Sequence, residues 1–417
     1  MPENDTTQQQ ACLRHEPPMS LTRKLSFLVE LAGKFGTCPP CLDSGALVWP
    51  PSNRETPNML QPLPLFDASD ASFRVLASDN KVPSVEPLRV SPWVAMSALQ
   101  KAIRRGDVDL ATRAAATLLK ADPAKLWRRL AGIVFEDVGL ASVETIRLVM
   151  SATTGKDARR QFGEWAVASL LVQKMCAAPK CRAADDMFIA LSHHLKLEAL
   201  RGDLARENLP EHLSRIRERR ALLGASLAAL HGTGVRWHGQ VPRKPADATA
   251  TFDAMRFAGI GHEIMALAEQ GFRRTREALP VLLPLLTRAL PSGDLPAADD
   301  DLPPVVIGHT GIPTYCLDGF SYEGKRALTR FLRRDTPSTQ WLRKHVPAER
   351  RVAALHGAVF RVEGGLVRQR VRWACAATLR RLADHGYHGM TLLDPAAFLD
   401  MVRADLPALD EVRHDVR

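Results

Sequence analysis

Aromatic residues and cysteines are both scarce in this chain of 417 residues. Phe, Trp and Tyr together make up 6% of it, and only three residues are tyrosines, which argues against an aromatic-rich protein that stacks along single-stranded nucleic acid. The seven cysteines are scattered and odd in number, unlike the framework of a disulfide-rich secreted protein. We therefore expect a reducing environment and a cytoplasmic location.

Long apolar runs are also missing. No stretch reaches the ~18 consecutive apolar residues of a membrane span, and the most apolar run, residues 278–286, is interrupted by Pro280 and Pro284. Near the N-terminus, the apolar stretch 25–32 contains Glu30 and follows a polar leader, which is not the pattern of a secretory signal. We expect no membrane partner.

Basic residues, by contrast, are in excess. Lys and Arg number 56 against 46 acidic residues, which gives a net charge of +10 and an isoelectric point near 9.5. Between Gly324 and Arg381 there are 15 basic residues and three acidic ones, so the whole positive excess of the chain lies in this segment. Because solvated helix faces normally interleave acids with bases, an arginine-rich segment almost without acids suits contact with phosphates.

This segment predicts a nucleic-acid interface, with DNA as the expected partner. The alternatives are a plain basic surface and a surface for a protein partner. No DNA-binding motif is recognisable, so no sequence-specific readout is expected. The expected contact residues are Lys325, Arg326, Arg330, Arg333, Arg334, Arg343, Lys344, Arg368, Arg370, Arg372 and Arg381.

Proline and acidic residues divide the chain. Residues 1–92 hold 13 of the 29 prolines and few periodic apolar segments, which predicts a mostly disordered N-terminal extension, with Met59 as an alternative translation start. Residues 291–304 are acidic and proline-rich, and they predict a linker. We therefore expect an all-α domain over 93–290 and a smaller, basic, mostly helical C-terminal domain over 305–417.

The predicted fold class is mainly α. In the first domain, Ser97 and Gln100 have the spacing of a capping box, while Asp107 and the pair Asp122-Pro123 are further helix starts. The helical spacing behind this last start predicts a core stripe of Leu126, Leu130, Ile133 and Val134. Later helices are predicted over 143–151, 159–177, 181–200, 209–230, 252–271 and 273–290.

The second domain is predicted to begin with short strands over 305–307 and 314–317. Helices are predicted to follow near 323–334, 337–345, 348–358 and 366–385. In the last of these, apolar residues from Val367 to Leu382 form one stripe, which leaves the neighbouring arginines beside or opposite it. A strand over 366–373 is the alternative, and it places Arg368, Arg370 and Arg372 on one face.

Four short motifs follow one another in the first domain. They are Ser97-Ala98-Leu99-Gln100-Lys101-Ala102-Ile103-Arg104 with Gly106-Asp107-Val108-Asp109, then Leu126-Trp127-Arg128-Arg129-Leu130, then Glu136-Asp137-Val138-Gly139-Leu140, and finally Ala177-Ala178-Pro179-Lys180. In this order and spacing, the segment from about 97 to 195 resembles the helical region that follows the ATPase core in bacterial replication-associated recombination proteins. These proteins, the RarA/MgsA group, are relatives of clamp loaders.

The resemblance implies a collar-like, all-α module for oligomerisation and for DNA-linked work at stalled forks, in replication, recombination and repair. Members of the family carry an AAA+ ATPase core before this region, but the 96 residues that precede it here hold neither phosphate-binding nor acidic metal motifs. We therefore expect no ATPase activity. Taken physically, the apolar residues of these motifs are core, and Glu136-Asp137 is a helix end and a cap rather than a catalytic pair.

Two other patterns come close to known sites without completing them. Residues 319–325 have the spacing of a phosphate-binding loop, but Arg326 stands where the loop needs Ser or Thr, so a turn entering a helix is the preferred interpretation. Cys38 and Cys41 have C-x-x-C spacing without a second pair, and no metal, cofactor or catalytic residue is expected. The glycine-punctuated stretch 307–325, with His309, Tyr315, Asp318 and Lys325, remains as an alternative small-ligand or nucleotide pocket.

The segment 59–66 resembles the short peptides with which bacterial replication and repair proteins dock on the sliding clamp. Gln61 would be its polar anchor, and Leu63, Leu65 and Phe66 would fill an apolar groove. The alternative is that the segment folds onto its own helical domain.

The function expected first is that of a non-enzymatic DNA-associated protein, which assembles through its helical domain and contacts nucleic acid through its arginine-rich C-terminal domain. The second is an interaction protein that joins or blocks oligomers of a related AAA+ ATPase without binding DNA. The third is an enzyme that binds a small ligand or nucleotide with residues 307–325.

Overall fold

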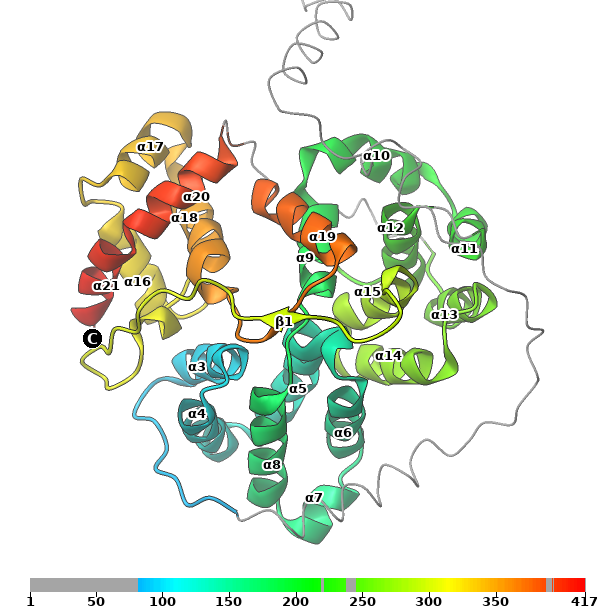
Figure 1. The fold of residues 1–417 in the computed structure, drawn as a ribbon, viewed down its shortest axis with the longest axis horizontal. Coiled ribbons are helices and arrows are strands. Elements are labelled where there is room, and N and C mark those ends of the chain that lie inside the picture. The colour runs from blue at the N-terminus through cyan, green and yellow to red at the C-terminus, as the bar shows by residue number, and fades with distance from the viewer. Residues whose placement is uncertain (1–81, 219–220, 238–244, 388–391, 393, 417) are drawn as a thin grey trace, which may run out of the picture. The chain divides into compact units, whose positions relative to one another are not determined.

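The computed structural model describes residues 82–218, 221–237, 245–387, 392 and 394–416. These residues are mainly helical, and the described part contains only two strands, each of two residues, which confirms the predicted fold class (Figure 1). Residues 1–81 lie outside the described part of the chain, and with them the predicted extension, Met59, the pair Cys38 and Cys41, and the clamp-binding segment with Gln61, Leu63, Leu65 and Phe66. Within the described part, every helix is too short or too polar to cross a membrane.

The first region is a set of short helices that includes α15, whose residues are all buried. α15 contacts α9, α12 and α14. The helices and helical turns of this region are α3 (Pro92–Arg105), α4 (Val108–Ala121), α5 (Pro123–Ile133), the π-helix η2 (Val134–Val138), η3 (Gly139–Ala141), α6 (Val143–Thr154), α7 (Asp157–Phe162), α8 (Glu164–Ala177), α9 (Ala183–His193), η4 (Leu195–Leu197), α10 (Glu198–Arg206), α11 (Leu209–Arg217), α12 (Leu222–Thr233), α13 (Ala248–Phe257), α14 (His262–Thr275), α15 (Leu279–Leu286) and η5 (Thr287–Ala289).

Helix starts agree with the sequence at two of the three predicted places. The side chain of Asp107 caps α4 and that of Asp122 caps α5, as predicted. The capping box at Ser97 is wrong, because α3 begins at Pro92, where the hydroxyl of Ser91 accepts a hydrogen bond from the backbone N–H of Val94. Ser97 lies inside α3, and its hydroxyl donates to Asp318 instead.

Several long predicted helices are pairs of short ones. The predicted helix 159–177 is divided at Gly163, and 252–271 is divided before α14 at Gly259; both glycines have a positive φ, which ends a helix without a side-chain clash. In the same way, 181–200 and 209–230 each cover more than one helix, and 273–290 covers the end of α14, the short α15 and the helical turn η5.

The C-terminal region contains a second core, which joins α16, α18, α20 and α21 (Figure 1, left). Phe331 and Phe398 are almost fully buried there. α19 departs from this group and packs mainly on α9. The elements are β1 (Ala297–Ala298), η6 (Thr314–Cys316), α16 (Tyr322–Phe331), α17 (Pro337–His345), η7 (Ala348–Arg350), α18 (Arg351–Val359), the π-helix η8 (Phe360–Gly364), β2 (Arg370–Val371), α19 (Ala374–His385), α20 (Pro395–Ala404) and α21 (Leu406–His414).

The segment before α19 differs from both predictions made for it. The helix begins at Ala374 rather than near 366, and only Arg370–Val371 is a strand. Gln369 has a φ of 49°, which breaks the alternation of an extended strand. As a result, Arg370 is buried while Arg368 and Arg372 are exposed, so the three do not share one face. The predicted strands are also wrong in place, since 314–316 is a helical turn and Ile307 makes one isolated bridge, to Pro313.

The predicted linker is attached to the C-terminal region. β1 pairs antiparallel with β2, with Ala297 opposite Val371. The backbone N–H of Val367 donates to Asp300 at 2.9 Å, and Val371 donates to the carbonyl oxygen of Lys180 at 2.9 Å. These bonds tie segment 291–304 and the end of α8 to the strand before α19. The division into domains 93–290 and 305–417 stays a prediction.

Candidate functional site

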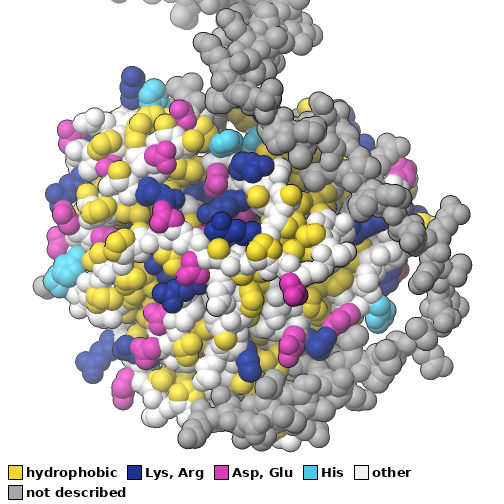
Figure 2. Space-filling model, in the orientation of Figure 1, with side chains coloured by type: hydrophobic (Ala, Val, Ile, Leu, Met, Phe, Trp, Pro, Cys, Tyr) yellow, Lys and Arg dark blue, Asp and Glu magenta, His cyan; other side chains and the backbone are white. Residues whose placement is uncertain are grey.

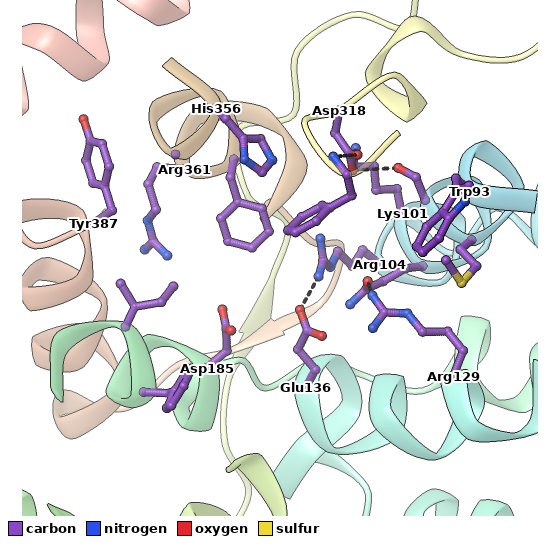
Figure 3. A pocket seen from close by; sticks show the side chains of 18 of the residues that line it. Trp93, Lys101, Arg104, Arg129, Glu136, Asp185, Asp318, His356, Arg361 and Tyr387 are labelled. Carbon is purple, nitrogen blue, oxygen red and sulfur yellow. Dashed lines mark hydrogen bonds and ion pairs between the residues drawn. The ribbon is translucent and has the colours of Figure 1, made fainter. Parts of the chain in front are cut away.

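A cavity of about 510 Å³ lies between α3, η2 and α9 on one side and residues 318–320, α18 and η8 on the other (Figure 3). This volume is in the range of about 300–1,000 Å³ that is typical of small-molecule sites. Its lining mixes aromatic rings with charged groups. The lining residues include Trp93, Ser97, Gln100, Lys101, Arg104, Arg129, Glu136, Asp185, Phe188, Asp318, Phe320, His356, Phe360, Arg361 and Tyr387.

α3 supplies one wall because its polar residues recur with helical spacing. Trp93, Ser97, Gln100 or Lys101, and Arg104 follow one another at intervals of three or four residues, and all five line the cavity. The apolar residues between them are buried against α4 and α8. The sequence shows this polar stripe, but it does not show what the stripe faces.

Asp318 fixes the opposite wall to α3. Its Oδ2 accepts hydrogen bonds from Lys101 Nζ and from the Ser97 hydroxyl, both at 2.8 Å, and its Oδ1 accepts from the backbone N–H of Phe320 at 2.9 Å. Burial by itself would raise the pKa of Asp318, but the Lys101 ammonium and these hydrogen bonds hold it far below its usual range. The carboxylate is therefore ionised at neutral pH and anchors the loop that carries Phe320.

The floor contains a buried network centred on Asp137, which is fully buried. Its carboxylate accepts from Gln100 Nε2 at 2.9 Å, from Arg104 Nε at 2.7 Å, and closely from Arg182. Gly139 ends η2 with a φ of 51°, and a Cβ there would lie 2.5 Å from the carbonyl oxygen of Cys181. Glycine is therefore required where η2 meets the start of α9.

Two further carboxylates point from the floor into the cavity. Figure 3 shows Glu136 rising from η2 and Asp185 from α9, with His356 and Arg361 on the facing wall. Burial raises the pKa of Asp185 to about 6 despite the adjacent Arg182. Burial also acts to raise the pKa of Glu136, but Arg104 and Arg182 outweigh it and lower this pKa to about 2. At neutral pH Glu136 is ionised and accepts hydrogen bonds, whereas the raised pKa of Asp185 lies within about one unit of neutral pH.

The structure gives the motif residues quoted for the family resemblance a structural role in this chain. The predicted core stripe is confirmed, since Leu126, Leu130, Ile133 and Val134 are fully buried. Arg104 and Asp137 hold α3 to η2. Glu136 and Asp137 do lie at a helix end, as predicted, because Gly139 ends η2, but they are not simple caps: Asp137 is the central acceptor of the buried network, with partners from α3 and from Arg182 before α9.

The alternative pocket over 307–325 is not assembled as a unit. Of its four polar residues, only Asp318 lines the cavity. Tyr315 is buried beneath the Arg105 guanidinium, His309 packs on His414, and Lys325 is exposed. The neighbouring Phe320, which the sequence did not single out, is the residue of this stretch that enters the cavity lining.

The near-match to a phosphate-binding loop is a turn into a helix, as predicted, although α16 begins at Tyr322 rather than at Gly324. The Ser321 hydroxyl caps it by accepting from the backbone N–H of Gly324 at 3.0 Å. Any side chain at Gly324 would overlap the backbone of Asp318, so close packing accounts for this glycine. Among the described residues, no cluster of three or more His, Cys, Asp or Glu side chains is placed to hold a metal ion.

The predicted nucleic-acid residues fall into two groups on different elements. The first lies on and after α16 and on α17, and consists of Lys325, Arg326, Arg330, Arg333, Arg334, Arg343 and Lys344. All are exposed except Arg326, which is partly buried and lies over the ring of Tyr322. Arg343 forms an ion pair with Asp335 at 2.6 Å.

The second group surrounds β2 and α19. Arg370 is buried and forms an ion pair with Asp300 at 2.8 Å, so its charge is neutralised locally. Arg368, Arg372 and Arg381 are exposed, and no carboxylate in the described part of the chain forms an ion pair with them. We call these three residues the arginine face. Figure 2 shows Lys and Arg side chains gathered near the centre of the view, where Figure 1 has β1 and α19.

Comparison of the chain with protein-family models, with curated proteins and with solved structures finds no match.

Proposed function

We propose that this is a cytoplasmic, non-enzymatic DNA-associated protein of replication or recombination, which contacts the phosphate backbone through its arginine face. The observation that carries the proposal is that Arg368, Arg372 and Arg381 are exposed without an ion-pair partner among the described residues. Some other exposed arginines do form ion pairs, for example Arg206 with Asp203 and Arg273 with Glu269.

Unpaired and paired arginines differ in the electrostatic field that they produce in the solvent. A paired guanidinium cancels much of its field locally, whereas a group of unpaired ones attracts a polyanion at a distance. Each phosphate that an arginine contacts releases condensed counterions, which supplies affinity without base contacts. The basic residues on and after α16 and on α17 add further positive charge, and Arg370 supports the arginine face through its ion pair with Asp300, which follows β1.

The test is binding of labelled single-stranded, duplex and forked DNA, followed by fluorescence anisotropy. A variant with Arg368→Glu, Arg372→Glu and Arg381→Glu is compared with the wild type. The matched control carries Arg160→Glu, Arg206→Glu and Arg273→Glu, which changes the net charge equally at exposed arginines that have acidic partners.

We expect the first variant to lose at least about tenfold in affinity and the control to lose much less, because direct phosphate contacts dominate the affinity. Equal losses of affinity in the two variants would show that DNA binding depends on the net charge of the protein and not on the arginine face. No binding by the wild type at about 50 mM salt would refute the DNA proposal, and the ATPase-partner alternative would then take its place.

A further inference from the structure

Two exposed aromatic side chains stand at the mouth of the cavity. Trp93, in the first turn of α3, is 53% exposed, and Phe320, before α16, is 68% exposed. Both rings are held in place from one side, Trp93 by the Lys125 ammonium at 5.1 Å from the ring centre and Phe320 by the edge-to-face ring of His356 at 4.8 Å. Large apolar rings that remain in water beside a cavity mark a surface for a planar, partly apolar ligand.

The floor below these rings offers hydrogen-bond acceptors. Glu136 uses Oε1 for Arg104 and Arg182, and Asp185 uses Oδ2 for Arg182. Gln100 also forms a hydrogen bond with Glu136, whereas in the described part of the chain no hydrogen bond reaches Asp185 Oδ1. A ligand that enters the cavity therefore meets the carboxylate of Glu136 and, beside it, an oxygen of Asp185 that needs an N–H or O–H donor.

The cavity lining also offers one hydrogen-bond donor, on Arg129. Arg129 lines the cavity, and its Nε is buried with no hydrogen-bond partner among the described residues. A complementary ligand thus carries an N–H donor next to an acceptor atom on a planar ring. A purely apolar ligand would leave Asp185 Oδ1 and Arg129 Nε without hydrogen-bond partners.

We propose that the cavity receives a single unpaired nucleobase with an exocyclic amino group, which stacks on Trp93 or Phe320 and donates to Glu136 or Asp185. Adenine, cytosine and guanine each place an amino group next to a ring acceptor or carbonyl, whereas thymine has no amino group. The base comes from a single strand or from a free nucleoside. Binding of a base within a single DNA strand rests on the proposed function, whereas binding of a free nucleoside does not.

The probe is 2-aminopurine, a fluorescent base with an exocyclic amino group, whose emission is quenched when it stacks on an aromatic ring. It is placed at the centre of a short oligothymidine, and in a parallel arm it is used as the free deoxyriboside. Overall binding of the same oligonucleotide is followed by the anisotropy of a terminal dye. The variant is Trp93→Ala with Phe320→Ala, and the matched control is Phe257→Ala, a phenylalanine that is 74% exposed on α13 and does not line the cavity.

We expect the oligonucleotide to be quenched several-fold by the wild type and by the Phe257→Ala control. The double variant should lose the quenching and bind the oligonucleotide about tenfold more weakly, because base stacking on aromatic rings is lost. In competition, an unlabelled oligothymidine with one central adenine should displace the probe better than one with thymine throughout. Because all three aromatic residues are largely exposed, these substitutions leave the core intact.

The outcomes separate this inference from the proposed function. Quenching of the free deoxyriboside alone supports the cavity with a free nucleoside as its ligand. Anisotropy that shows binding without quenching in either arm overturns the inference and leaves the arginine face standing. Quenching that survives in the double variant also overturns it, and a lack of both quenching and binding overturns the inference and the proposed function together.

Discussion

The ion pair between Lys101 and Asp318 should be one of the strongest links between α3 and the C-terminal region. Their charged atoms are 2.8 Å apart, and the two side chains are only 5% and 12% exposed. Lys101→Met leaves a buried carboxylate with Ser97 and one backbone N–H as partners, and Asp318→Asn leaves a buried ammonium beside the carbonyl oxygen of Tyr315. Removing one partner of a buried pair typically costs about 3–5 kcal/mol of the free energy of unfolding.

The double variant should cost little more than either single one, because no charge is then left unpaired. The coupling energy of the cycle is accordingly expected to be about 3 kcal/mol. Urea denaturation, followed by tryptophan fluorescence, measures all four proteins. Costs that add to within about 0.5 kcal/mol would show that the two charges do not stabilise each other, and would refute this account of how the loop at Phe320 is held.

The same pair predicts a dependence on pH. Because the folded-state pKa of Asp318 lies below its unfolded value of about 3.9, its contribution is complete above that value and is lost as the pH falls below it. Between about pH 5 and pH 3 the wild type should lose more free energy of unfolding than Asp318→Asn does. Equal losses in the two proteins would contradict the assignment.

Two further predictions concern single residues. Gly139→Ala should destabilise the protein by about 1–3 kcal/mol, because the residue has a positive φ and a Cβ there meets the carbonyl oxygen of Cys181; an unchanged denaturation midpoint would be inconsistent with this contact. The buried thiols of Cys176, Cys181 and Cys316, whose pKa values burial raises to about 12, 11 and 12, should react with iodoacetamide at pH 7 only after denaturation, and rapid labelling of these three in the native protein, seen by peptide mass mapping, would contradict their burial.

Local signals in the sequence identified the helical fold and part of its core, since capping residues and apolar spacing act within a few residues. Asp107 and the stripe from Leu126 to Val134 are examples. Ser97 was misinterpreted because its true partner, Asp318, lies 221 residues away, so a local capping pattern was the only visible explanation. The burial of Arg370 depends on the left-handed backbone at Gln369, which no spacing rule reveals.

The cavity could not be found from the sequence for the same reason. Trp93, Glu136, Asp185 and Phe320 come from four separate segments, and none belongs to a recognisable binding motif. Scarcity of aromatics argued against stacking on single strands, but composition does not show that several of the few aromatic rings line one cavity. The polar stripe of α3 was the single local signal of the cavity. It forms a charged face on a helix whose environment is otherwise apolar, and such a face needs partners.

The central claim is that the arginine face contacts phosphates, and the salt dependence of DNA binding tests it most directly. The logarithm of the binding constant is measured against the logarithm of the salt concentration for the wild type, for Arg368→Gln with Arg372→Gln and Arg381→Gln, and for the control Arg160→Gln with Arg206→Gln and Arg273→Gln. Each lost phosphate contact should reduce the slope by about 0.9 on duplex DNA, so the first variant should have a clearly shallower slope while the control keeps that of the wild type. An unchanged slope in the first variant, or an equal reduction in the control, would contradict the claim.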